Sequence, residues 1–272
     1  MTTTVRRHLC LLPIIFGLLA AAAVRAPAEN AQAILARVRQ LGQTTRHWSD
    51  RVQRLHLRII DRRGGERQRD LVIYLKKYPE DRTRTLVFFE SPPDVKGVGM
   101  LQWADPHAQD QQWLYVPELK RVRQIGAGAK QESFAGTDFS FDDLAIMSQI
   151  TDWTEADARA ELVGTESLDG QPCHVIQFTP VAKALTYGRI VIWLRTADLV
   201  VLRYSMHDGA GRRQKVLSLS DLRPVGTIPS AFRMEMQNVG AGSRTAVDFT
   251  DIKYNVGLAD DLFTQRALER GQ

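Results

Sequence analysis

The stretch VQRLHLRIIDRRGGERQRDLVIYL, residues 52–75, alternates apolar and polar side chains on both sides of a glycine pair. Every second residue from Leu55 to Ile59 is apolar, which is the period of a strand with one buried face. Gly64 and Gly65 then interrupt the pattern with a pair that is typical of a tight turn. The stretch therefore predicts a β-hairpin.

Similar runs continue along the rest of the chain and are separated by turn residues. They lie at 82–90, 98–103, 111–116, 121–125, 231–238 and 244–254, and the turn pairs Asp169-Gly170, Ala197-Asp198 and Asp208-Gly209 separate further runs between them. Short turns of this kind join antiparallel strands, so we expect a meander of about ten or eleven strands. The runs at 86–89, 190–194 and 199–202 are apolar at successive positions, which requires both faces of the sheet to be hidden from water.

Helices are predicted at only two or three places. Ala31, Ile34, Leu35, Val38 and Leu41 recur at helical spacing, a short helix capped by Asp138 or Ser140 is expected to end near Gln149, and Leu262, Phe263 and Leu268 form a partial closing stripe. This supply of helices is small for so large a sheet, so the fold class is mainly β (α+β). The sheet hides two faces either by curling around the helices, which leaves an apolar cavity, or by splitting into a sandwich.

The first residues have the three parts of a secretory signal peptide. Arg6 and Arg7 precede an apolar run, and small residues follow it as far as Ala28. We expect cleavage near Ala28, which makes 1–28 a signal peptide and 29–272 a single exported domain.

Export changes what the composition implies. Of 36 Lys and Arg, three lie in the signal peptide, so 33 remain against 31 Asp and Glu, and the mature chain is nearly neutral. It keeps one cysteine, Cys173, for which core packing is the better explanation. Nucleic acid is set aside as a partner, and the scattered histidines fit no metal motif. We expect no cofactor and no catalytic residues.

Large and pliable apolar side chains are the candidates for the lining of a cavity that accepts acyl chains, although packing in the core is the default interpretation for each. They are Phe88, Met100, Trp103, Trp113, Tyr115, Trp193, Met206, Met234 and Met236.

Nine arginines on the opening strands make one end of the sheet basic. They are Arg51, Arg54, Arg58, Arg62, Arg63, Arg67, Arg69, Arg82 and Arg84. This pattern fits a solvated sheet edge. It also fits a docking surface for an acidic partner or for anionic lipid.

Three pieces of sequence resemble the bacterial outer-membrane lipoprotein-sorting proteins, relatives of LolA and LolB. The pieces are 96–101, 113–125 and 134–144, and the matching positions are Gly97, Gly99, Pro117, Arg121, Arg123, Phe134, Gly136, Asp138, Phe139 and Asp142. We expect the glycines to permit a bulge or close approach, Pro117 to end a strand and Asp138 to cap the short helix. Arg121 and Arg123 are expected to hold that helix through Asp142 or Asp143.

The resemblance implies a half-open antiparallel β-barrel wrapped around helices, with a hydrophobic cavity and no catalytic residues. It implies a periplasmic monomer that carries lipid or lipoprotein acyl chains to or from a membrane partner, either an inner-membrane exporter of the RND/MMPL type or an outer-membrane acceptor. The alternative is a non-catalytic sensor or adaptor that binds lipid or lipoprotein and reports to a membrane protein.

Overall fold

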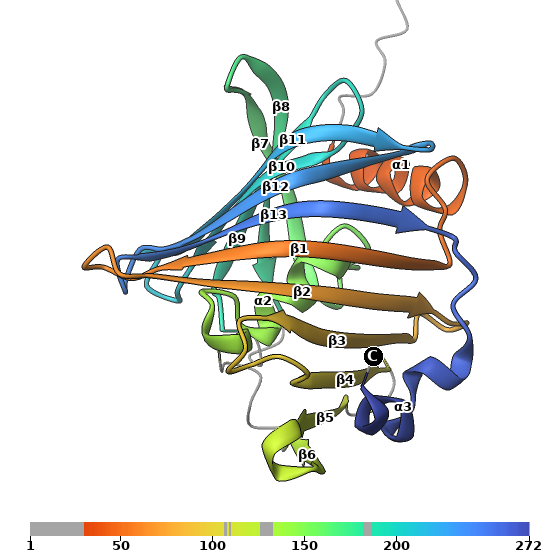
Figure 1. Cartoon of the computed structure of the whole chain (residues 1–272). Helices are drawn as coiled ribbons and strands as arrows, with labels where there is room; N and C mark the ends of the chain where they lie inside the picture. Colours follow the sequence, from red (N-terminus) through yellow and green to blue (C-terminus); the bar gives the residue numbers. More distant parts are fainter. Residues whose placement is uncertain (1–29, 106–107, 109, 126–132, 182–185, 272) are drawn as a thin grey trace, which may run out of the picture.

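The alternating runs of the sequence form neighbouring strands in the computed structural model, which describes residues 30–105, 108, 110–125, 133–181 and 186–271 (Figure 1). The expected signal peptide lies outside the described residues. The elements are α1 (Ala31–Gln43), β1 (Asp50–Ile60), β2 (Glu66–Lys77), β3 (Thr83–Ser91), β4 (Gly99–Ala104), β5 (Gln111–Val116), η1 (Pro117–Leu119), β6 (Arg121–Ile125), η3 (Phe134–Gly136), α2 (Phe141–Gln149), β7 (Ala158–Leu168), β8 (Gln171–Pro180), β9 (Arg189–Arg195), β10 (Val201–His207), β11 (Arg213–Val225), β12 (Ile228–Asn238), β13 (Ser243–Tyr254), η4 (Asp260–Phe263) and α3 (Gln265–Arg270).

Within the described residues, thirteen strands form one antiparallel sheet in the order β6-β5-β4-β3-β2-β1-β13-β12-β11-β10-β9-β8-β7. Two meanders make up this order, β1 to β6 and β7 to β13. The segment that contains η3 and α2 connects them in the chain, and pairing of β1 with β13 joins them in the sheet. The expected number of about ten or eleven strands is wrong: five strands, β7 to β11, surround the turn pairs at 169–170, 197–198 and 208–209, and with the eight other strands the described residues form thirteen.

The sheet is open and strongly curled. Asp152 and Trp153, consecutive residues after α2, reach opposite parts of it: Asp152 acts electrostatically on Lys77 at the end of β2, and the Trp153 ring lies 6.0 Å from the Phe178 ring of β8. Seven strand spacings separate β2 from β8, which is about 34 Å in a flat sheet at about 4.8 Å per spacing. Only a curled sheet brings both strands to one short segment.

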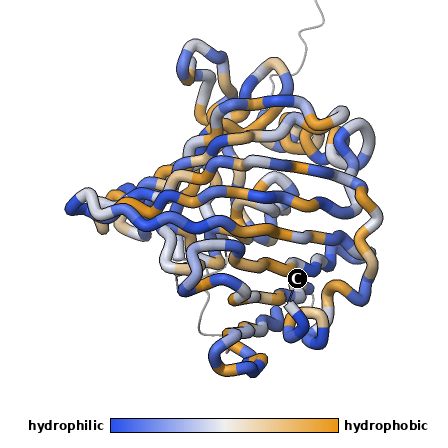
Figure 2. The backbone as a smooth tube through the Cα atoms, in the orientation of Figure 1, coloured by the Kyte–Doolittle hydropathy of each residue, from blue (hydrophilic) through white to orange (hydrophobic). Residues whose placement is uncertain are grey.

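The two faces of the sheet have separate cores, and the alternation that produces them is visible along β1 and β2 in Figure 2. We call inner the face that packs against α1 and α2, where Ile34 of α1 and Ile146 of α2 join Leu71 of β2 in one core. We call outer the opposite face, where Phe263 of η4 and Leu268 of α3 are completely buried. As expected, both faces of β3 are buried, since residues 86–89 are at most 8% exposed.

The three predicted helices are confirmed, although the closing one consists of η4 followed by α3. No helix in the described part of the chain is long and apolar enough to cross a membrane. Cys173 is completely buried, as its strand position suggested.

Candidate functional site

The segment from Phe134 to Gln149 forms a loop and a short helix on the inner face. Ser140 is the N-cap of α2, because its hydroxyl accepts from the Asp143 backbone N–H, 3.2 Å away, while the Asp143 carboxylate accepts from the Ser140 backbone N–H at 2.7 Å. This reciprocal pair is a capping box, which satisfies two otherwise unpaired N–H groups and defines where the helix begins. Gly136 has a φ of +72°, a conformation that side chains disfavour.

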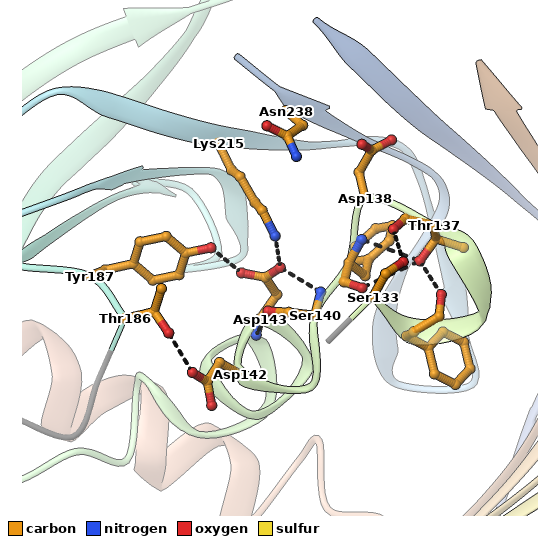
Figure 3. Close-up of polar contacts among 12 residues, drawn as sticks. Ser133, Thr137, Asp138, Ser140, Asp142, Asp143, Thr186, Tyr187, Lys215 and Asn238 are labelled. Carbon is orange, nitrogen blue, oxygen red and sulfur yellow. Dashed lines mark hydrogen bonds and ion pairs between the residues drawn. The ribbon is translucent and has the colours of Figure 1, made fainter. Parts of the chain in front are cut away.

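Asp143 is the most deeply buried charged residue of the segment, with no exposed surface. Its carboxylate receives the Lys215 ammonium of β11 at 2.6 Å and the Tyr187 hydroxyl at 2.7 Å, in addition to the Ser140 N–H (Figure 3). Burial, followed by the Asp143 charge, raises the pKa of the Tyr187 hydroxyl. Tyr187 therefore remains a protonated donor, and each oxygen of the buried carboxylate accepts at least one hydrogen bond.

Asp138 and Asp142 are held in the same way by hydroxyl groups. Thr245 of β13 accepts from the Asp138 backbone N–H at 2.9 Å and donates to its carboxylate at 2.7 Å, and the Ser243 hydroxyl donates to the second carboxylate oxygen. Asp142 accepts from the Thr186 hydroxyl at 2.6 Å. Asp138 therefore binds the sheet and does not cap α2, which corrects the expectation from the sequence.

We call this network the polar anchor; it consists of Asp138, Asp142, Asp143, Thr186, Tyr187, Lys215, Ser243 and Thr245. Each carboxylate receives donors from the protein itself, an arrangement that fixes positions. The expected pairing of Arg121 and Arg123 with this helix is wrong, because both arginines are exposed on the edge strand β6 and the carboxylates have the other partners just described. The sequence contained no signal for Lys215, Tyr187 or Thr245, since strand residues distant in sequence meet the helix only after the sheet curls.

Beside the polar anchor, the inner face carries apolar side chains that are only partly buried. They come from the sheet and from both helices: Val38, Leu41, Ile73, Leu144, Met147, Trp153, Leu219, Met234 and Phe249. Strand register makes the surface continuous, since Leu219 of β11 pairs with Met234 of β12, which pairs with Val247 of β13. The helices thus cover the inner face without burying it completely.

The nine residues expected to line one cavity are divided between the two faces. Met100, Met206, Met234 and Met236 lie in the inner core or against it. Phe88, Trp103, Trp113 and Tyr115 belong to the outer core beneath η4 and α3, and Trp193 packs in a third cluster with Leu168 and Leu202. The prediction that these nine residues line one cavity is therefore wrong. The aromatic residues follow the outward positions of their strands, a distinction that composition alone does not make.

Gly97, Gly99 and Pro117 have the structural roles expected of them. At Gly99 an added Cβ would lie 2.6 Å from Cε1 of Phe88 and 2.7 Å from Cδ1 of Leu268, so the strand is in close contact with the outer core. Gly97 has a φ of +82°, and Pro117 begins η1 directly after β5. Phe134 and Phe139 are buried in the inner core, which attaches the motif loop to it.

Comparisons with known proteins give the same fold. A family model that is described only as an uncharacterized protein matches residues 81–270. A "putative outer membrane lipoprotein-sorting protein domain" from Vibrio parahaemolyticus is similar over 88% of this chain and 100% of its own, with 24% identity and a TM-score of 0.77. A DUF1329 family protein from Desulfovibrio piger shares 27% identity over 88% of this chain and 97% of its own, with a TM-score of 0.78. A LolA superfamily protein from Nitrosomonas europaea shares 16% identity over 88% and 100% of the two chains, with a TM-score of 0.65. No curated protein matches the chain.

Proposed function

Because the chain belongs to this family of uncharacterized proteins and has the fold of the LolA superfamily, we propose that it is a non-catalytic periplasmic carrier for lipid or lipoprotein acyl chains. The observation that carries the proposal is the incompletely buried apolar surface of the inner face, shared by α1, α2 and the strands between them. An acyl chain laid against this surface removes apolar area from water on both partners.

The energy of such burial is sufficient for a carrier. Each methylene contributes about 0.8 kcal/mol, so about ten buried methylenes supply about 8 kcal/mol before the cost of ordering the chain. Met147 and Met234 lie at this surface, and their unbranched, polarisable side chains adapt to ligands of different shape. Binding of this kind depends more on the length of the ligand's acyl chain than on the exact structure of the ligand.

Transfer of the cargo requires a partner that binds the empty carrier and the loaded carrier with different affinities. An inner-membrane exporter of the RND/MMPL type or an outer-membrane acceptor would supply that change. The polar anchor supports the proposal that cargo binds on the inner face. It fixes α2 by hydrogen bonds and an ion pair, and the apolar surface beside it therefore stays available for the cargo.

The test is native mass spectrometry with lipid extraction on residues 29–272, purified from a bacterial periplasm without detergent. We expect stoichiometric lipid or acylated peptide on the wild-type chain and its loss from Met234→Lys, which introduces a charge into the inner face. Val239→Lys is the matched control, because Val239 is 52% exposed in the hairpin after the same strand. An empty wild-type protein that also fails to bind a fluorescent apolar probe would overturn the proposal.

A further inference from the structure

Two cations lie against one tryptophan at the end of the sheet where β1 begins and β2 ends, on the right in Figure 1. The guanidinium carbon of Arg51 is 4.9 Å from the centroid of the Trp48 ring, and the ammonium nitrogen of Lys77 is 4.0 Å from it. Trp48 lies between α1 and β1, and Arg51 and Lys77 are at the start of β1 and the end of β2. Local sequence and strand pairing together bring the two positive charges close to each other.

Both cations belong to the inner face. Leu55 and Leu71 are in the inner core and pair with each other across β1 and β2. Successive side chains of a strand alternate between faces, so Arg51, four residues before Leu55, and Lys77, six residues after Leu71, point to the same side. The intervening inner positions on β2 are Ile73 and Leu75, both only partly buried, and Leu75 pairs with Arg51. The cations therefore lie where the partly buried apolar surface of the inner face reaches the end of the sheet, which we call the rim.

The charge at this rim is incompletely compensated. The Nε–H of Arg51 is buried and has no hydrogen-bond acceptor among the described residues, and a neighbour bonded to its guanidinium is the hydroxyl of Tyr254. Desolvation and then the charge of Arg51 lower the pKa of Lys77, although Asp152 and Asp81 act in the opposite direction. The two carboxylates thus do not restore the pKa of Lys77 to its ordinary value.

We propose that Arg51 and Lys77 bind the anionic oxygen atoms of a lipid headgroup, phosphate or carboxylate, whose acyl chains lie on the inner face. The proposal rests on the proposed function, because it takes the apolar surface as the place of the chains. A guanidinium offers forked donors and an ammonium offers a mobile point charge, a combination that suits a phosphate or carboxylate group.

The proposal is tested by calorimetric titration of the full mature protein with dodecyl phosphate and with dodecyl maltoside, both below their micelle concentrations. The two ligands share one alkyl chain, so a difference in affinity measures the contribution of the headgroup. We expect the wild type to bind dodecyl phosphate about tenfold more tightly, the difference that one charge-assisted hydrogen bond supplies. Arg51→Gln/Lys77→Gln should remove this preference and leave dodecyl maltoside binding unchanged. Arg121→Gln/Arg123→Gln, which removes two exposed charges at the β6 edge, should keep the preference.

The outcomes separate the two proposals. Equal affinity of the wild type for both ligands, or an equal loss of both in the double variant, overturns the headgroup site and leaves the carrier in place. No binding of either ligand overturns the carrier itself. Displacement of dodecyl phosphate by inorganic phosphate at similar concentration would assign the cations to a free anion and overturn the lipid assignment. If the double variant does not fold, Lys77→Gln alone at the exposed end of β2 should still reduce the preference.

Discussion

The ion pair between Lys215 and Asp143 gives the most direct test of the polar anchor, through the substitution Lys215→Met. The Lys215 side chain is 15% exposed and that of Asp143 is 0% exposed, and their charged atoms are 2.6 Å apart. Methionine fills a similar volume but leaves the buried carboxylate with only the donors from Tyr187 and Ser140. Removal of one partner of a buried pair costs about 3 to 5 kcal/mol, because the other charge stays buried and uncompensated.

Urea unfolding followed by circular dichroism measures this loss as a change in the free energy of unfolding at constant m-value. Lys253→Met is the matched control, since Lys253 pairs with Asp251 at 2.9 Å but is 62% exposed. A surface pair of this kind contributes less than about 1 kcal/mol. A double-mutant cycle with Asp143→Asn should give a coupling free energy of about 2 kcal/mol or more. If Lys215→Met costs no more than Lys253→Met, the polar anchor does not hold α2 in place.

Three further predictions concern other parts of the fold. Gly99→Ala should destabilise the protein by about 1 to 3 kcal/mol through overpacking against the Phe88 ring, whereas Gly209→Ala, with no neighbouring atom within 4 Å, should change the melting temperature little. Burial lowers the pKa of His207 below its ordinary 6.5, so the unfolded chain takes up a proton first and stability should fall as the pH drops below 6.5; in urea titrations at two pH values His207→Gln should reduce this fall. Burial also raises the pKa of the Cys173 thiol, so we expect Ellman's reagent to react with it in 29–272 only after denaturant is added; rapid reaction of the native protein would contradict the buried position.

Local patterns in the sequence predict most of the secondary structure. The hairpin of β1 and β2 follows from period-two alternation around a glycine pair, and α1 follows from apolar residues at helical spacing. Both patterns act over a few residues, so they are readable without knowledge of the rest of the chain. The meander follows as well, since short turns leave adjacent antiparallel strands as the simplest arrangement.

The candidate site depends on contacts between residues far apart in the chain, and there the prediction was weaker. The sequence predicts either Asp138 or Ser140 as the cap of α2, since both residue types cap helices, whereas Asp138 is bound by Thr245, which is 107 residues away. Trp113 was assigned to a cavity for its size, but β5 turns it towards the outer core. Which face an aromatic residue occupies depends on strand register and on the position of α3, and neither is encoded near that residue.

The division of the core between two faces explains how the proposed carrier can be stable although apolar side chains of its inner face are only partly buried. Packing of the outer face around Phe263 and Leu268, both completely buried, stabilises β2 to β5 in addition to their contacts on the inner face. On the inner face, the polar anchor holds α2 by an ion pair and hydrogen bonds, whose directions fix a position that apolar contacts alone would leave adjustable. Apolar side chains around Met234 can then remain partly exposed, since neither the sheet nor the helix depends on their complete burial. Filling of that surface by an acyl chain should accordingly raise stability with the logarithm of the ligand concentration once that concentration exceeds the dissociation constant, with little change in the positions of the strands.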